Sequence, residues 1–496
     1  MVSVGRFLLL AMLFSAAYVQ WPLYSLNQNT YFLHGLAQAG VGHLTDDFLV
    51  QTRDPFPVFS FLVEVTYRLN QNLFYLFYVL LLGIYVCSLL GIASQLFQTG
   101  RSRVRTLVFL AVLFVVHAGV FRSRIGWLYS GVAGQYVLGT VLQPSVFGVL
   151  LIASIYFYLR KKPFYAVALL ALAATVHSTY LLGAASLTLA YMLVTLKEEN
   201  DRKKALFIGL TAFVLVLPVV LFAYSSFAPT SPEAWDTAQR ILVDFRFPHH
   251  ANPSYWLDAT ALAQMTVILL ALILVRKKVL FWLLAVPAAV GVGLTILQVL
   301  SGSRSLAMLF PWRVSVFLVP IATAILTAWG VDSVWPYWQR TLKRNGGRVL
   351  FALGLALIAV SVFSGAVLTL AQVSAREASA AAPMMQFVRD HSDAGDMFLI
   401  PLEMEDFRLY TGVPVFVDFK SHPYRDTEVI EWYDRLRQVE AVYEAEDGEA
   451  CDMIEMLAAT YGVTHIVFVS GEYQGGCPIL ELWYADAVYE IYRIIL

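Results

Sequence analysis

Two adjacent carboxylates near the N-terminus are the residues of this sequence best suited to chemistry. Asp46 and Asp47 lie in the segment HGLAQAGVGHLTDDFLVQTRDPFP (34–57), which also contains His34, His43, Arg53 and Asp54. One carboxylate could act as a general base, or both could hold a divalent cation such as Mg²⁺ or Mn²⁺, because hard cations prefer carboxylate oxygen. The structural alternative is a helix N-cap, since Thr45-Asp46-Asp47 precedes FLV and suits the start of a short interfacial helix.

A second set of candidates lies in the segment DFRFPHHANPSYW (244–256), where Arg246, His249 and His250 stand among aromatic residues. Arginine offers a planar fork that matches phosphate, and histidine can donate to a phosphate or bind a metal. The His-His pair lacks the usual spacing of metal ligands. We therefore expect these three residues to bind a phosphate, with a turn of no chemical role as the alternative.

Two further arginines occur in SGSRSLAMLFPWRVS (301–315), where Arg304 and Arg313 are the only bases and no acid is close in sequence. This pattern suits the monophosphate or diphosphate of a lipid carrier, and anchoring to lipid headgroups is the competing explanation. Arg122 and Arg124 lie in the apolar, glycine-rich segment GVFRSRIGWLYSGVAGQYVLGTVLQPS (119–145). They are substrate-binding candidates as well, unless they only snorkel to the headgroup region.

The chain that must position these side chains is too apolar for a soluble globular protein. Of its 496 residues 59% are hydrophobic and 14% are charged, against roughly 25% charged in soluble domains. A bilayer core requires about 20 apolar residues per helix, and lipid excludes unpaired backbone groups. The apolar runs predict eleven transmembrane helices, at residues 7–26, 73–97, 107–121, 141–159, 164–176, 180–196, 205–223, 259–275, 279–300, 314–330 and 349–371.

Lys and Arg residues gather in alternate connections between these helices. The dense basic clusters lie at residues 100–105, 160–162, 197–204, 276–278 and 339–348. By the positive-inside rule these connections and the N-terminus face the cytoplasm. The extracytoplasmic segments are then 27–72, 122–140, 224–258, 301–313 and the C-terminal part. We therefore expect a multi-pass membrane protein with a cytoplasmic N-terminus and an extracytoplasmic C-terminal part.

The C-terminal part is acidic and differs from the rest of the chain. Residues 375–496 contain 23 Asp and Glu but 8 Lys and Arg, a balance of −15, whereas residues 1–374 carry +14. Strand-like runs at 397–402, 413–419, 464–470 and 487–495 and helical periodicity at 428–443 and 451–461 predict a soluble α/β domain. Cys451 and Cys477 in this domain either pair or remain as free thiols.

Several function classes lose support from the sequence. It contains no P-loop, no GxSxG, no HExxH and no zinc-type CxxC pair, so ATPase, serine-hydrolase and zinc-protease mechanisms are not indicated. An acidic exposed domain would be repelled by nucleic acid.

The arrangement resembles the GT-C superfamily, the membrane glycosyltransferases that use polyprenyl-phosphate-linked sugars. Acids in the first outer loop, about eleven helices, a phosphate-friendly outer loop and an extracytoplasmic C-terminal α/β domain carry this resemblance along the whole chain. The segments GQYVLGTVLQPS, FRFPHHANP and DFKSHPYRDTEVIEWYDR are more narrowly similar to an uncharacterised bacterial membrane-protein family near these enzymes. This similarity implies that the membrane is a bacterial inner membrane. The chain departs from the oligosaccharyltransferase branch, because it has no WWDYG-like motif.

The resemblance implies an inverting transfer of a sugar from a polyprenyl-phosphate donor to a lipid, glycan or protein acceptor. Asp46 or Asp47 would take the acceptor proton or sit beside a metal. The donor phosphate would lie among Arg246, His249, His250, Arg304 and Arg313. The rival classes are a transporter or lipid flippase, which would place charges along a central path, and a non-catalytic membrane scaffold.

Overall fold

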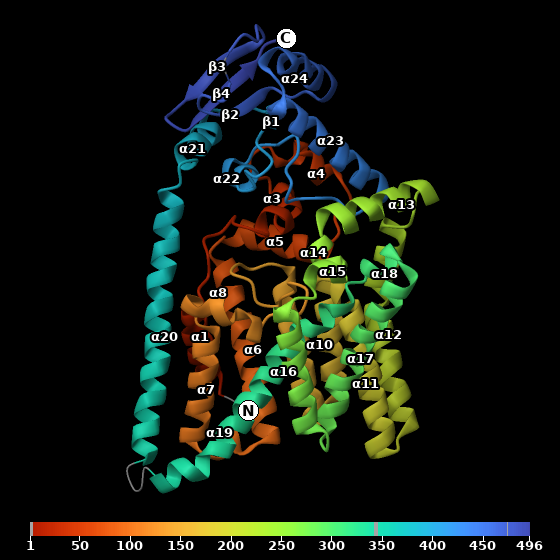
Figure 1. Cartoon of the computed structure of the whole chain (residues 1–496), viewed down its shortest axis with the longest axis vertical. Helices are drawn as coiled ribbons and strands as arrows, with labels where there is room; N and C mark the ends of the chain where they lie inside the picture. Colours follow the sequence, from red (N-terminus) through yellow and green to blue (C-terminus); the bar gives the residue numbers. More distant parts are fainter. Residues whose placement is uncertain (1–2, 342–345, 474) are drawn as a thin grey trace. The chain divides into compact units, whose positions relative to one another are not determined.

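The computed structural model describes residues 3–341, 346–473 and 475–496, and helices dominate it (Figure 1). Its contacts divide the chain into two compact units. Unit 1 comprises Met1–Gln20, Phe74–Phe222 and Val243–Leu370, and unit 2 comprises Trp21–Leu73, Ala223–Leu242 and Ala371–Leu496. The chain therefore passes from one unit to the other more than once, and each unit is described separately.

Unit 1 is built from apolar helices whose backbone groups pair within each helix, as a bilayer requires. Its long helices are α1 (Val4–Tyr18), α6 (Leu73–Leu96), α7 (Arg103–His117), α9 (Val149–Leu159), α10 (Pro163–Val176), α11 (Leu181–Val194), α12 (Arg202–Ser226), α16 (Ala259–Val275), α17 (Val279–Ser301), α19 (Ser315–Thr341) and α20 (Gly346–Glu377). The shorter α8 (Arg122–Ile125), α14 (Pro248–Ala251), α15 (Pro253–Trp256) and α18 (Arg304–Ala307) lie in the connections.

Each of the eleven apolar runs contains a helix, but the expected count of eleven spans is not supported. Within the described part of the chain, six helices are long and apolar enough to cross a membrane, or seven if the bent pair Arg103–His117 and Gly119–Leu128 is one span. Four other apolar helices are shorter, among them Val4–Tyr18 with 15 residues. At 1.5 Å per residue such a helix falls short of a core of about 30 Å. The apolar runs in the sequence correctly predicted where the helices lie. Several of the helices are shorter than those runs, because the helical backbone is interrupted near their ends.

Local signals explain where several of these helices begin and end. Asp258 caps α16 by accepting a hydrogen bond from the Ala261 amide at 2.8 Å, and Pro163 opens α10 at its first turn. Gly302 ends α17 in the left-handed region at φ 62°. Gly365 of α20 is required for packing, because a Cβ there would lie 2.0 Å from the Ala16 carbonyl oxygen.

Unit 2 joins three separate stretches of sequence. Its elements are α2 (Gln28–Tyr31), α3 (Leu33–Gln38), α4 (Phe48–Gln51), α5 (Pro57–Leu69), α13 (Pro232–Arg240), α21 (Ala382–His391), β1 (Phe398–Leu399), α22 (Phe407–Thr411), α23 (Asp426–Glu444), α24 (Asp447–Tyr461), β2 (His465–Val469), β3 (Leu480–Ala485) and β4 (Tyr489–Ile494). The sequence boundary at residue 375 separated the tail from the rest of the chain. The contacts add residues 21–73 and 223–242 to it.

The sheet of unit 2 has four strands in the order β1-β2-β4-β3 (Figure 1). β1 is parallel to β2, and the other pairs are antiparallel. The strand expected at 413–419 forms only one bridge, between Val415 and Phe398. β3 lies in a stretch that no strand prediction covered, because its partly exposed residues lack a buried alternating face.

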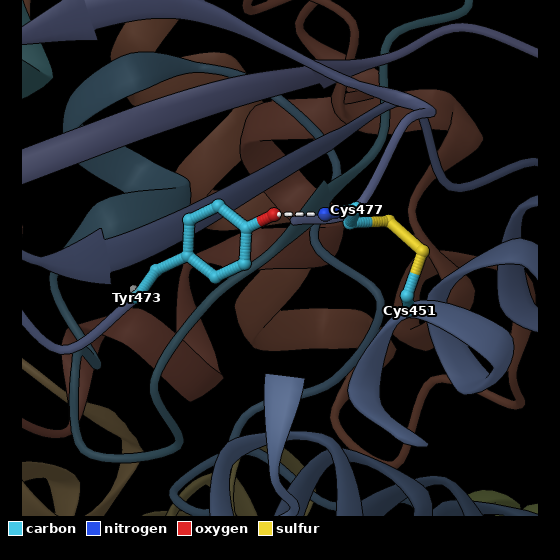
Figure 2. Close-up of a disulfide and its surroundings, with 3 residues drawn as sticks. All are labelled: Cys451, Tyr473 and Cys477. Atoms are coloured by element: carbon cyan, nitrogen blue, oxygen red, sulfur yellow. Dashed lines mark hydrogen bonds between the residues drawn. A yellow bond between two sulfur atoms is a disulfide. The ribbon is translucent and has the colours of Figure 1, made fainter. Parts of the chain in front are cut away.

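A disulfide joins Cys451 of α24 to Cys477 in the loop before β3 (Figure 2). The Cys477 amide also donates a hydrogen bond to the Tyr473 hydroxyl at 2.8 Å. The sequence left this pairing open. The structure brings the two Cα atoms to 5.4 Å, within the span of a disulfide.

Replacing both Cys451 and Cys477 with serine is expected to lower the free energy of unfolding of unit 2 by about 2–4 kcal/mol, since the bond no longer restricts the unfolded chain. Urea-dependent proteolysis of the full-length protein in detergent measures this change. Cys87→Ser, which removes the cysteine outside the disulfide, serves as the control. Unfolding of the double variant at the wild-type urea concentration would contradict the prediction.

Candidate functional site

Asp47 is fully buried, and each of its carboxylate oxygens is occupied by hydrogen bonds within unit 2. Oδ1 accepts from the Leu49 amide at 2.9 Å, which makes Asp47 the N-cap of α4. Oδ2 accepts from the Arg408 Nε at 2.7 Å and from the Val415 amide at 3.0 Å. Asp47 therefore joins the first loop to the C-terminal part of the chain.

Arg408 lies between two carboxylates. Besides Asp47 it donates to Asp418, and the side chains of all three residues are no more than 3% exposed. Burial by itself would lower the pKa of the Arg408 guanidinium, but the charges of Asp47 and Asp418 raise it above its ordinary value. Asp418 is held in turn by the Ser421 amide at 2.6 Å. This buried Asp47–Arg408–Asp418 triad keeps its charges because each has partners.

These contacts give Asp47 a structural role and argue against the role of free base or metal ligand expected for it. Its neighbour Asp46 is exposed, and the Thr45 hydroxyl lies at 3.5 Å from it. The N-cap alternative drawn from the sequence thus describes Asp47. The sequence could not distinguish the two carboxylates, because the partner Arg408 lies 361 positions away along the chain.

Other contacts fix the same loop within unit 2. Gly42 approaches the backbone of Gly412 so closely that a Cβ would lie 2.1 Å from the Gly412 carbonyl oxygen. The Arg53 amide donates to the Glu428 carboxylate at 3.1 Å. Burial raises the pKa of Glu428, and the hydrogen bond from Arg53 only partly offsets this.

A narrow cleft lies in unit 2 beside this loop. It contains about 10 Å³ of space, which is room for about one water molecule. The lining includes His34, Asp54 and Phe56 from the first loop and His422 and Tyr424 from the C-terminal part. The rings of Phe56 and Tyr424 meet edge to face, with centroids 5.9 Å apart. A larger ligand must displace these aromatic side chains to enter.

Asp54 is the carboxylate of this cleft. Its Oδ1 accepts from the Phe56 amide at 2.8 Å. Its Oδ2 is buried and has no hydrogen-bond partner in the part of the chain that the structure describes. A buried carboxylate oxygen without a donor is costly, and an incoming hydroxyl would satisfy it. The sequence contained Asp54 in RDPFP, but only the fold shows that it, and not Asp47, has an open acceptor.

Basic side chains from two connections of unit 1 come together in what we call the cationic cluster, namely Arg246, His249, His250 and Arg313. The rings of His249 and His250 lie 4.1 Å apart. Burial, together with the nearby His249, Arg313 and Arg246, lowers the pKa of His250 to about 4, although the hydrogen bond to the Ala133 carbonyl, at 2.6 Å, opposes the shift. His250 is therefore neutral at pH 7 and donates through Nδ1.

Apolar packing holds the two connections in place. Val243, Ala251, Ala307, Met308 and Phe310 form one buried cluster around α14 and α18, which are labelled in Figure 1. The Gln298 side chain donates to the Ala251 carbonyl at 2.6 Å. The Arg313 Nε is buried and lacks a hydrogen-bond partner among the described residues.

Arg304 has an acidic partner, although no acid lies close to it in the sequence. Its guanidinium pairs with Asp244 at 3.0 Å, and both side chains are partly exposed. The partner is 60 positions away, so local sequence did not reveal it. An exposed ion pair of this kind contributes little to stability, but it gives the Arg304 guanidinium a counter-charge.

Arg122 and Arg124 share the short helix α8 but not their surroundings. Arg124 is exposed. Arg122 lines a cavity of about 370 Å³ in unit 1. No group of three or more His, Cys, Asp or Glu residues suited to a metal ion occurs in residues 3–341, 346–473 and 475–496. The divalent cation considered for Asp46 and Asp47 remains a prediction.

Comparison with known proteins gives one family match. Residues 379–439 match a domain of unknown function (DUF6798). This segment contains Arg408 and Asp418 of the triad and His422 and Tyr424 of the cleft. No curated protein matches the chain. The match covers a small part of the chain and assigns no chemistry to it.

Asp47→Asn is expected to destabilise unit 2 by about 1–3 kcal/mol, because it weakens the hydrogen bonds from the buried Arg408 guanidinium and the Val415 amide, while Asp418 still balances the Arg408 charge. Asp46→Asn is the matched control and should change stability by less than about 0.5 kcal/mol, since the side chain is exposed. Urea-dependent proteolysis of both full-length variants measures the difference. Equal stability of the two variants would show that the triad does not support the fold.

Proposed function

We propose that this membrane protein is a glycosyltransferase that moves a sugar from a polyprenyl-phosphate-linked donor to a hydroxyl of a lipid, glycan or protein acceptor. The observation that carries the proposal is the cationic cluster, in which two arginines and two histidines gather in connections between apolar helices. A phosphate attached to a lipid is the ligand that such a place suits, because its tail can remain in the bilayer while arginine binds its head.

The proposed transfer requires cations that bind the leaving phosphate and a carboxylate that accepts the acceptor proton. The acceptor hydroxyl attacks C1 of the sugar, and the bond from C1 to the phosphate oxygen breaks with inversion. The electron pair leaves with the lipid phosphate, whose charge Arg246 and Arg313 would offset in the transition state. The acceptor proton passes to a carboxylate in the first loop. Asp54 is the best candidate for this base because its Oδ2 lacks a hydrogen-bond partner among the described residues.

Two observations support an extracytoplasmic location for this chemistry. The dense Lys and Arg clusters lie in the alternate set of connections. The Cys451–Cys477 disulfide is typical of an oxidising compartment, so it favours a tail outside the cytoplasm. Polyprenyl-linked donors used on that side would require no nucleotide-binding motif, and the sequence has no P-loop.

Asp54→Asn is expected to lower turnover by about 10²–10⁴-fold while leaving the fold intact, because the amide cannot accept the proton. Release of polyprenyl phosphate from a polyprenyl-phosphate hexose in proteoliposomes measures turnover. Asp46→Asn is the control and should retain wild-type turnover. Full activity of Asp54→Asn would remove Asp54 from the mechanism.

Arg313→Gln is expected to raise the KM for the polyprenyl-phosphate donor by about tenfold or more, because one charge-assisted hydrogen bond to the phosphate is lost. The same proteoliposome assay at varied donor concentration gives the KM. Arg240→Gln removes an exposed arginine that pairs with Asp236 and should leave the KM unchanged. An unchanged KM in Arg313→Gln would count against the phosphate site.

A further inference from the structure

Arg122 is a charged residue of unit 1 that is surrounded by neutral groups. It makes no ion pair with any described residue, although its side chain is mostly withdrawn from solvent. Its Nη2 donates to the Tyr18 carbonyl at 2.5 Å, and its guanidinium lies 4.6 Å from the centroid of the Tyr18 ring. Its Nε is buried without a hydrogen-bond partner in the described part of the chain.

These neutral contacts only partly replace the water that a guanidinium loses on burial. A carbonyl oxygen and an aromatic face each attract the cation, but neither cancels a unit charge. Retaining such a charge is costly unless an anion is bound for part of the time. Arg122 is therefore a candidate for binding an anionic ligand.

The cavity beside Arg122 has the size and lining for such a ligand. Its volume of about 370 Å³ falls in the range of small-molecule sites. Its walls include the aromatic rings of Tyr18, Trp127, Tyr129 and Tyr136. Tyr18 and Tyr129 are almost fully buried, and the Tyr18 hydroxyl donates to the Leu138 carbonyl at 2.8 Å, so these walls are fixed by packing.

The lining indicates the class of ligand. One arginine in a largely aromatic wall suits an anion that is joined to an apolar or ring-shaped group. The lining residues contain no carboxylate that would repel an anion. A phosphate group is the anion that the planar guanidinium matches best, because two parallel N–H groups can face two of its oxygens.

We propose that the Arg122 cavity is a second phosphate-binding site, separate from the cationic cluster, which takes a phosphate carried on an amphiphile or a free phosphate compound. The loop 119–140 gives the two sites a physical link. Its Ala133 carbonyl accepts the hydrogen bond from His250 of the cluster, and its residues from Gly126 to Thr140 line much of the cavity. A ligand bound at either site therefore lies beside a loop that contributes to both sites.

The test uses the full-length protein purified in detergent, stripped of lipid, with native mass spectrometry to count bound molecules. Three probes separate the ligand sources: a diacylglycerol phosphate, the same diacylglycerol without phosphate, and inorganic phosphate. The Arg313→Gln background weakens binding at the cationic cluster, so that a further loss of binding in Arg122→Gln reports on the Arg122 cavity.

In that background we expect the diacylglycerol phosphate to bind and the neutral diacylglycerol to bind at least about tenfold more weakly, as loss of a charge-assisted hydrogen bond predicts. Adding Arg122→Gln should reduce binding of the phosphate lipid by about tenfold to a hundredfold, whereas Arg124→Gln, the exposed neighbour on α8, should not. Binding of inorganic phosphate with the same dependence on Arg122 would assign the site to a soluble phosphate compound.

Thermal unfolding of the lipid-free variants separates a binding role from a structural one. If Arg122 only holds the Tyr18 carbonyl, Arg122→Gln lowers the unfolding temperature. If Arg122 serves a ligand, the temperature stays the same or rises, because an uncompensated buried charge has been removed. The proposal is overturned if no phosphate probe binds, if neutral lipid binds equally well, or if Arg124→Gln loses as much binding as Arg122→Gln. None of these outcomes depends on glycosyl transfer.

Discussion

A guanidinium removed from water must have its counter-charges supplied by the protein, and unit 2 is organised around that requirement. Arg408 lies between Asp47 and Asp418, all three buried. Asp47 comes from the first loop and the other two come from the C-terminal part, so the buried charge of Asp47 meets Arg408 only when the two stretches pack together. The close approach of Gly42 to Gly412 and the hydrogen bond from the Arg53 amide to Glu428 become available in the same arrangement.

This constraint changes which carboxylate is chemically available. Asp47 accepts three hydrogen bonds and neutralises Arg408, which leaves it unsuited to take a proton from a substrate. Asp54, seven positions later, retains a buried oxygen without a donor among the described residues. The fixed loop thus presents Asp54 in the cleft with His34 and His422. Asp47 of the ion triad and the candidate base Asp54 belong to the same short loop, so the triad helps to hold Asp54 in place.

In unit 1 two groups of basic side chains lie in the connections between apolar helices. The cationic cluster and Arg122 are both partly withdrawn from water, and the loop 119–140 contacts His250 and lines the Arg122 cavity. Sites of this kind are consistent with ligands that carry negative charge on an apolar body, since bilayer and protein can share the two ends of such a molecule. Arg304 differs from Arg122 because it pairs with the carboxylate of Asp244, and a charge that already has a partner has less to gain from a ligand.

The sequence by itself determined the membrane class, the position of each apolar helix, the acidic α/β tail and the basic residues of the cluster. These properties follow from composition and from short-range periodicity, which depend on neighbouring residues only. The tertiary structure decided the rest: the number of helices long enough to span, the Cys451–Cys477 bond, the burial of Asp47, the open acceptor of Asp54 and the cavity at Arg122. The disulfide, the burial of Asp47 and the Arg122 cavity depend on residues far apart in sequence, as when Asp47 meets Arg408 across 361 positions. Periodicity carries no information about such pairs, because packing alone brings them together.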